Sequence, residues 1–169
     1  MKQPKPLVQK VIPSPLGDLR LVAGPQGLAG VWFMQNQQHA PSGERVDSWP
    51  LVGDHPVLDD ASRQIDAYFQ GKLRRFELPL DLAQGTPFQQ QVWQALLGIP
   101  AGETTSYGVL SQRIGRPKAV RALGAAVGRN PLSIVVPCHR VVGAAGALTG
   151  YAGGLERKRA LLLLESGLP

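Results

Sequence analysis

The run Ile134-Val135-Val136-Pro137-Cys138-His139-Arg140 places the only cysteine of the chain between an apolar stretch and two basic side chains. The apolar stretch, which follows Asn130-Pro131, has the length of a buried strand or an extended segment. A thiol is nucleophilic only as the thiolate, and adjacent cationic or basic groups raise the thiolate fraction. A lone free cysteine is most often a small buried hydrophobic residue, but that role needs no histidine or arginine beside it. Cys138 is therefore a candidate nucleophile.

The composition is that of a globular protein of one domain or two small ones, with 169 residues of which 43% are hydrophobic. A single cysteine excludes an intramolecular disulfide and a zinc site built on several thiolates, so we expect no metal and no cofactor. No long apolar run follows residues 1–5, so we expect no signal peptide. No stretch approaches the length of a membrane span. These features predict a cytoplasmic protein of a reducing compartment that contacts no membrane.

Positive charge is concentrated in the second half of the chain. Residues 1–82 contain nine basic and nine acidic side chains, whereas residues 83–169 contain nine basic and three acidic ones. The second half therefore carries the whole net charge of +6. This asymmetry favours a polyanion-binding surface on the second half, although a merely solvated basic face is an open alternative.

Residues 1–82 are expected to form an α/β scaffold without catalytic groups. Three short apolar runs separated by turns predict a meander of strands: 7–12, 18–23 and 28–34. A loop is expected over residues 35–54, and residues 75–82 can return as a strand. Between them a helix is predicted by apolar residues at helical spacing: Leu58, Ala61, Ile65 and Phe69.

Residues 83–169 are expected to be mostly helical. Thr86-Pro87-Phe88-Gln89 has the pattern of a helix start, with Thr as N-cap, Pro next and Gln three residues after the cap. A second helix begins near Ser106 and ends at Gly115-Arg116-Pro117, and a third follows at once, which matches a helix-turn-helix. A final helix is predicted over residues 155–166.

The third of these helices has an outer face of small residues. It is expected to bury Val120, Leu123 and Val127 and to expose one long side chain, that of Arg121, among small ones: Ala122, Ala125 and Gly128. A helix that reads the major groove needs Asn, Gln or Arg aimed at base edges. Small residues instead suit a helix pressed against phosphates or into a narrow groove, with Arg121 probing the base stack. Two packed helices of an ordinary bundle are the alternative.

The motif Pro137-Cys138-His139-Arg140, preceded by Asn130-Pro131 and followed by Gly150-Tyr151, closely resembles that of the O6-alkylguanine-DNA alkyltransferases (methylated-DNA–protein-cysteine methyltransferases). The resemblance covers residues 84–166. It implies a mixed α/β (α+β) fold with two domains. Residues 1–82 would be the small ribonuclease-H-like scaffold, and residues 83–169 the mostly helical DNA-binding and alkyl-transfer domain with the helix-turn-helix.

The same resemblance implies repair of alkylated DNA by direct reversal. The protein would bind double-stranded DNA in the minor groove as a monomer and flip the damaged nucleotide out of the stack. It would then move the alkyl group from O6-alkylguanine to Cys138, irreversibly and once per molecule. O4-alkylthymine is a further candidate substrate, and clustering along DNA is left open.

Roles in catalysis follow from the resemblance residue by residue. Cys138 would accept the alkyl group, His139 would act through a water as its base, and Glu165 would orient His139. Asn130 would tie the helix-turn-helix to the active-site segment. Tyr107 would contact the adjacent phosphate and protonate the departing guanine.

Roles in binding follow in the same way. Arg121 would enter the duplex and fill the space of the extruded nucleotide, on a helix whose small residues face the DNA. Backbone groups of Cys138 and Val141 would bind the guanine edge, and Tyr151 and Ala152 would wall the pocket. Ala152 stands where some members have Ser, which bears on tolerance for larger alkyl groups. Arg140 would hold the motif structurally.

Two other classes of protein compete with this interpretation. A DNA-binding regulator with an incidental cysteine needs base-reading side chains, which the Ala/Gly face lacks. A cysteine hydrolase needs a nucleophile and a base that meet from separate elements. Neighbouring side chains such as Cys138 and His139 point in different directions along an extended backbone, which makes direct pairing unfavourable.

Overall fold

The computed structural model describes residues 7–167, so residues 1–5, on which the expected absence of a signal peptide rests, lie outside the described part. The elements in chain order are β1 (Val8–Ile12), β2 (Leu19–Gly24), β3 (Gly27–Phe33), α1 (Glu44–Asp47), α2 (Pro56–Phe69), α3 (Pro87–Leu96), β4 (Thr105–Ser106), α4 (Tyr107–Arg113), α5 (Val120–Gly128), the 3-10 helix η1 (Cys138–Arg140), β5 (Val141–Val142), the 3-10 helix η2 (Ala144–Gly146) and α6 (Leu155–Ser166). Within this part no helix is long and apolar enough to cross a membrane.

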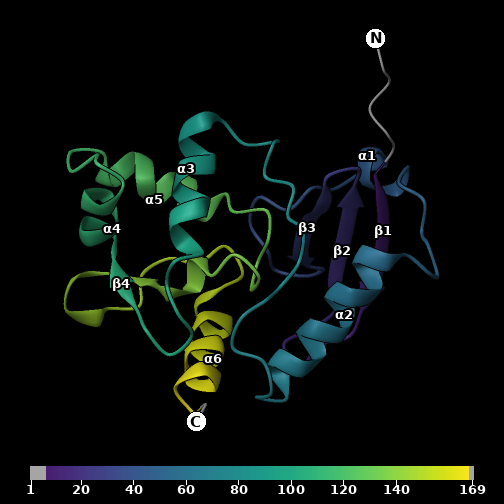
Figure 1. Ribbon diagram of the computed structural model, residues 1–169. Coiled ribbons are helices and arrows are strands. Elements are labelled where there is room, and N and C mark those ends of the chain that lie inside the picture. Colours follow the sequence, from purple (N-terminus) through teal and green to yellow (C-terminus); the bar gives the residue numbers. More distant parts are fainter. Residues whose placement is uncertain (1–6, 168–169) are drawn as a thin grey trace.

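The N-terminal part is an antiparallel meander in the order β1-β2-β3, as the sequence predicts. Helix α2 packs across one face of this sheet, the short α1 lies beside one end of it, and helices α3 to α6 gather on the other side of the molecule (Figure 1). The face of α2 turned toward the sheet is apolar apart from Gln64, and its largest buried side chain is Tyr68 rather than Phe69.

Two expectations for this part are wrong. The loop over residues 35–54 contains the single helical turn α1, which Val46 anchors because its side chain is buried. Residues 75–82 form no strand but only an isolated bridge between Leu80 and Leu28. Pro79 accepts a bond from the Leu28 N–H at 2.8 Å but has no N–H of its own, so the ladder cannot extend there.

Helices α3, α4 and α6 begin where the sequence predicts, whereas α5 does not follow α4 at once but begins at Val120, after a turn over Pro117 and Lys118. Thr86 and Gln89 form a reciprocal capping box at the start of α3. The Ser106 side chain accepts from the Val109 N–H at 3.1 Å and caps α4. Gly115, at φ +73°, lets the chain leave α4 in the left-handed conformation and turn into α5. Helices α4 and α5 thus form the predicted helix-turn-helix, and the mixed α/β fold with a helical C-terminal part is confirmed.

The segment that leads to Cys138 is not the expected strand or extended run. It makes one bridge, between Leu132 and Val31 of β3, and then turns. Ile134 adopts φ +73°, which a β-branched residue reaches only when its surroundings impose it, and its side chain is fully buried. Cys138 follows in a 3-10 turn rather than on extended backbone.

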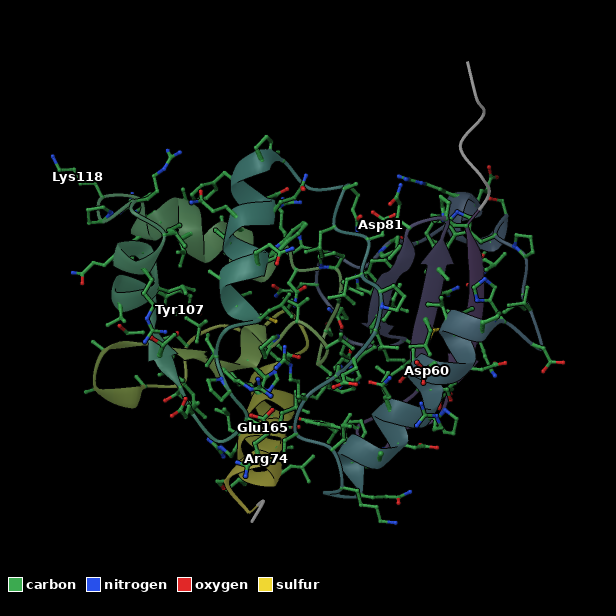
Figure 2. The ribbon with its side chains drawn as sticks, in the orientation of Figure 1. Asp60, Arg74, Asp81, Tyr107, Lys118 and Glu165 are labelled. Atoms are coloured by element: carbon green, nitrogen blue, oxygen red, sulfur yellow. The ribbon has the colours of Figure 1, made fainter. Side chains whose placement is uncertain are left out.

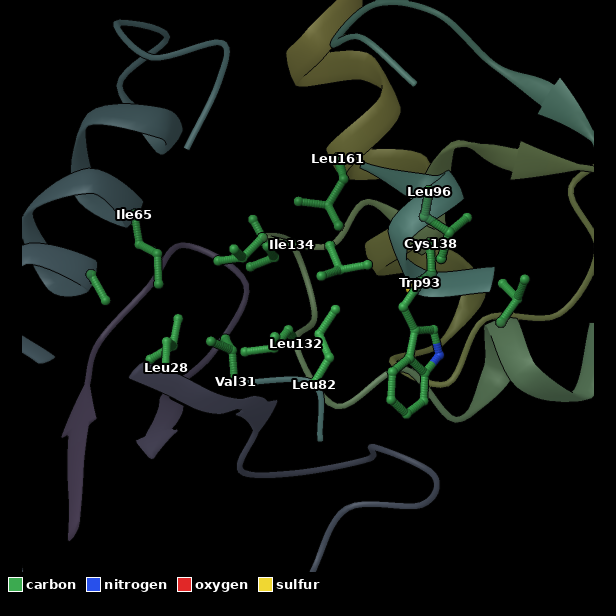
Figure 3. Close-up of a cluster of buried hydrophobic side chains, with 14 of the residues drawn as sticks. Leu28, Val31, Ile65, Leu82, Trp93, Leu96, Leu132, Ile134, Cys138 and Leu161 are labelled. Atoms are coloured by element: carbon green, nitrogen blue, oxygen red, sulfur yellow. The ribbon is translucent and has the colours of Figure 1, made fainter. Parts of the chain in front are cut away.

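One continuous hydrophobic core joins the two parts of the chain. Figure 3 shows Leu28 and Val31 of the sheet, then Leu132 and Ile134, then Cys138 near Trp93 and Leu96 of α3. The nucleophile candidate is therefore held by the same core that packs the sheet against the helices. Its position depends on both parts.

Candidate active site

Cys138 is a free thiol at the floor of a pocket of about 450 Å³. Its side chain is packed in the core, and only 5% of the residue is exposed. The pocket has the size of a small-molecule site. Its walls come from α4, α5, the loop before α6 and one residue of the N-terminal part: Gln38, Tyr107, Val120, Arg121, Gly124, Val127, Gly128, Thr149, Gly150, Tyr151 and Ala152.

Six of the twelve predicted site residues line this pocket: Tyr107, Arg121, Gly128, Cys138, Tyr151 and Ala152. His139, Glu165 and Asn130 are buried outside its lining. Ala122 and Ala125 are exposed on α5 outside the pocket lining. Val141 is fully buried in β5 and does not line the pocket either; its carbonyl accepts from Lys158 Nζ at 2.6 Å. Val120 does not face the core as expected. It is 40% exposed and forms part of the pocket wall, because α5 begins at this residue and turns it toward the opening.

Behind Cys138 lies a group of buried polar side chains that we call the rear cluster: Tyr68, His139, Arg140, Lys158 and Glu165. Glu165, on α6 (Figure 2), lies within hydrogen-bond distance of three of the other members. The Oε1 atom lies 2.6 Å from His139 Nε2 and accepts from Arg140 Nη2 at 2.8 Å, while Oε2 accepts from Arg140 Nε at 3.0 Å. Tyr68 donates its hydroxyl to Oε1 at 2.8 Å. Arg140 also donates from Nη1 to the Ile99 carbonyl at 2.5 Å, which fixes η1 against the end of α3.

Asn130 lies between the helix-turn-helix and the active-site segment. It follows α5, and its Nδ2 donates to the Val136 carbonyl at 2.8 Å while its Oδ1 accepts from the Leu132 N–H at 2.9 Å. The side chain is 4% exposed, so these bonds form in a dry environment where they are strong. Asn130 therefore closes the turn that presents Cys138.

The resting thiol is not a thiolate held by its neighbours, contrary to expectation. Burial raises the pKa of Cys138, and this outweighs the opposing effects of the Asn130 amide and the Lys158 charge. Arg140 is occupied by Glu165 and Ile99. Burial also lowers the pKa of His139 below its ordinary value of 6.5, although the hydrogen bond and charge of Glu165 raise it. Thiol and imidazole are thus both neutral near pH 7 in the free protein.

The hydrogen bonds fix which nitrogen of His139 is basic. Burial alone would raise the pKa of Glu165, but the bonds from His139 and Arg140 bring it to about 2, so the carboxylate is ionised and can only accept. His139 Nε2 must then carry the proton, which leaves Nδ1 with the lone pair. Nδ1 is buried and has no hydrogen-bond partner among residues 7–167. It is the free base of the site.

Lys158 and Tyr68 are functional-site residues that the sequence did not single out. Lys158 is completely buried, and its ammonium donates to the carbonyls of Val141, Thr149 and Gly150 at 2.6, 2.9 and 3.3 Å. It thereby ties α6 to the loop that walls the pocket. One sequence signal could have found Lys158. It lies three residues before the apolar Leu161, and Glu165 lies four residues after Leu161, so all three share one face of the final helix.

Five basic side chains are exposed on and beside the helix-turn-helix: Arg113, Arg116, Lys118, Arg121 and Arg129. No acidic residue occurs in the chain between Glu103 and Glu156, so nothing in this stretch offsets them. Figure 2 shows Lys118 at the outer tip of the turn and Tyr107 at the inner start of α4. The surface beside the pocket opening is strongly positive and suits a polyanion.

Two family models match the chain. The ribonuclease-like domain of 6-O-methylguanine DNA methyltransferase matches residues 7–82, and the DNA binding domain of the same family matches residues 87–167. The chain belongs to the 6-O-methylguanine DNA methyltransferase family. This membership accounts for the arrangement of thiol, imidazole and carboxylate better than a regulator with an incidental cysteine, which is not favoured.

Individual members of the methyltransferase family match over nearly the whole chain. The methylated-DNA–protein-cysteine methyltransferase of Methanosarcina acetivorans is 48% identical over 92% of this chain and 96% of its own length. That of Mycobacterium tuberculosis is 49% identical over 92% and 90%. A crystal structure of the M. tuberculosis O6-methylguanine methyltransferase superposes with a TM-score of 0.85 at 45% identity, covering 96% of this chain and 94% of that one. An M. tuberculosis structure in complex with DNA gives 0.82 at 48% identity, covering 94% and 92%.

Proposed function

We propose that this methyltransferase takes the alkyl group of O6-alkylguanine in double-stranded DNA onto Cys138 Sγ, once per molecule. The observation that carries the proposal is a free thiol at the floor of a pocket, backed by a histidine whose free nitrogen is basic. A soft sulfur nucleophile is well suited to attack at carbon. The thioether that forms has no easy reversal, so the protein is a reagent consumed by its own reaction.

The first step is removal of the thiol proton. Because burial raises the pKa of Cys138, a base must act during the attack rather than beforehand. His139 Nδ1 takes the proton through a water molecule, and Glu165 stabilises the imidazolium that forms, since it already accepts from Nε2 at 2.6 Å. The charge of Lys158 also favours the thiolate.

The second step exchanges the two bonds at the alkyl carbon. Sγ forms a bond to this carbon while the carbon–O6 bond breaks. The electron pair of the broken bond leaves with the guanine. A departing guanine anion needs a proton or a strong hydrogen bond. Tyr107 lines the pocket beside Cys138, and its hydroxyl donates that proton. His139 then returns the thiol proton through solvent to the Tyr107 oxygen. The net proton transfer is therefore from the thiol to the departing guanine.

The target base must leave the stack to reach the pocket. Helix α5 approaches the minor groove with its small outer residues, Ala122, Ala125 and Gly128, and Arg121 enters the space of the extruded nucleotide. Arg121 is exposed and lies on the pocket rim, so it reaches both duplex and pocket. The protein acts as a monomer, since one chain supplies every group used here.

Intact-protein mass spectrometry tests the proposal. After incubation with a duplex that contains O6-methylguanine, the mass should rise by one methylene unit, once, and peptide mapping should place it on Cys138. The Cys138→Ser variant should still bind the duplex but gain no mass. An unchanged mass of the wild-type protein under reducing conditions would reject the transfer. A duplex with O4-methylthymine in the same position measures the preference between the two lesions.

A further inference from the structure

Tyr68, in the N-terminal part, hydrogen-bonds to Glu165 in the rear cluster. It lies near the end of α2 and is fully buried. Its hydroxyl donates to Glu165 Oε1 at 2.8 Å, the same oxygen that His139 Nε2 approaches at 2.6 Å. Burial and the Glu165 charge raise the pKa of Tyr68 far above its ordinary value, so the hydroxyl is a permanent donor.

We propose that Tyr68 is a positioning residue for the transfer reaction, which sets how strongly Glu165 holds the Nε2 proton of His139. The inference rests on the proposed base role of His139. A hydroxyl that donates to Glu165 Oε1 draws electron density from this oxygen, which also accepts from His139 Nε2–H. The N-terminal part therefore takes part in the chemistry of Cys138 and is more than a scaffold.

The direction of the effect follows from the shared oxygen. Without the Tyr68 hydroxyl, Oε1 becomes a stronger acceptor for His139 Nε2–H and stabilises the imidazolium more. The pKa of His139 then rises toward its ordinary value, and a larger fraction of the protein carries a protonated histidine that cannot act as a base. Transfer should lose rate on the acidic side of its pH profile and keep it on the alkaline side.

The charged groups that face His139 come from two elements, and a neutral hydroxyl approaches from a third. Glu165 and Lys158 approach from α6, and Arg140 from η1. Tyr68 approaches from α2 and contacts Glu165. Glu165 raises the pKa of His139, whereas Arg140 and Lys158 lower it. Tyr68→Phe leaves these three charges in place and removes one hydrogen bond, so it isolates the contribution of the hydroxyl.

Nitrogen-15 NMR of histidine-labelled protein measures the pKa of His139 directly, because the chain has only 3 histidines and His139→Gln assigns the signal. The Tyr68→Phe variant should raise that pKa by about one pH unit. The acid limb of single-turnover transfer from the free O6-methylguanine base should move by the same amount. The rate below the midpoint should fall about tenfold.

Phe76→Leu is the matched control. Its ring lies 5.5 Å from that of Tyr68, so the change disturbs the packing of Tyr68 without removing the hydroxyl. If Tyr68 were only a packing residue, the two variants would leave the His139 titration equally unmoved, and that result would overturn the proposal. A second measurement uses Glu165→Gln, in which adding Tyr68→Phe should cause no further shift; an equal shift in that background would also overturn it.

The outcome is distinguishable from failure of the proposed function. Should wild-type protein take no methyl group from DNA, the transfer mechanism itself is wrong. Should wild-type protein react normally while Tyr68→Phe keeps the wild-type titration of His139, only the role of Tyr68 is refuted.

Discussion

The pocket in front of Cys138 and the rear cluster behind it are built from opposite kinds of residue. The pocket is lined mainly by glycine, aliphatic and aromatic side chains, and its one charged group, Arg121, is exposed to solvent. The rear cluster is made of groups that are rarely buried, yet none of its members is more than 6% exposed. Cys138 belongs to the pocket lining, and the next residue in the chain, His139, belongs to the rear cluster.

In the proposed function, this difference separates base binding from proton transfer. A concave pocket of small and aromatic residues suits a flat base. Buried charges are tolerated only when they are paired and hydrogen-bonded, and here each charge of the rear cluster has partners. We therefore expect changes at the rear to alter stability and pH dependence, and changes at the front to alter the handling of DNA.

Glu165→Gln should have the largest effect. It removes the charge that balances Arg140 and His139, and breaking a buried pair in this way costs about 3–5 kcal/mol of unfolding free energy. Transfer should fall about 100-fold or more, because the imidazolium loses its counter-charge. Urea unfolding and single-turnover kinetics measure both quantities. Glu156→Gln, an exposed position on the same helix, is the control, and equal behaviour of the two variants would contradict a special role for Glu165.

Acid should weaken the fold through the same residue. The pKa of Glu165 is about 2 in the folded protein against 4.5 ordinarily, so its stabilisation is complete above pH 4.5 and is lost as the pH falls toward 2. The full contribution is about 3 kcal/mol. His139 acts in the same direction from pH 6.5 downward, because its pKa is lowered and the unfolded chain binds the proton first. A stability profile measured in urea that stays flat from pH 7 to 3 would contradict this assignment.

Arg121→Ala should impair only the reaction with duplex DNA at the pocket. Holding a nucleotide outside the stack costs a few kcal/mol, and loss of the residue that fills the gap should slow transfer from duplex DNA about 10- to 100-fold. Reaction with the free O6-methylguanine base should change little, and so should the unfolding free energy. Arg113→Ala removes an equal charge from α4 and should weaken binding without this selectivity. Equal losses on duplex and free base would exclude a flipping role for Arg121.

Lys158→Met should give the smallest effect. The substitution is in the rear cluster, but it should also change the mobility of the pocket wall. The side chain keeps its length but loses its bonds to three carbonyls, with an expected loss of about 1–2 kcal/mol in unfolding free energy. Hydrogen exchange should accelerate at the amides of residues 149–152, which form part of the pocket wall, more than elsewhere. Arg159→Met, at an exposed neighbour on α6, should leave exchange in that loop unchanged.

The sequence predicted those features that depend on local signals. Alternating apolar residues and glycine-containing turns predicted the meander, and the Thr86–Gln89 pattern predicted the start of α3. The pocket residues Tyr107, Arg121 and Tyr151 do come together around Cys138. Each of them lies at a helix start, on a helix face or in a glycine-rich loop, where residue type and position carry a specific meaning.

The features that the sequence missed depend on contacts between distant elements. The left-handed backbone of Ile134 has no signal in a run of aliphatic residues, so the turn before Cys138 was interpreted as extended. Helical spacing selected Phe69 on α2, yet the fully buried residue is its neighbour Tyr68, whose hydroxyl bonds to Glu165 on α6. Likewise, burial raises the pKa of Cys138, and burial is a property of the whole fold.

The outer edge of strand β3 is occupied by two pieces of chain. Residues 79–81 bond to Leu28 at one end, and Pro131 and Ser133 bond to Val31 at the other. Cutting the polypeptide between residues 82 and 87 would keep residues 79–81 on the same fragment as Leu28 but would make the contact of Val31 with Pro131 and Ser133 intermolecular. The fragment that carries β3 would then present unpaired backbone groups at Val31, which invite sheet extension. A split reporter built from this protein should therefore reassemble by strand-edge docking, with alkylation of the thiol as its readout.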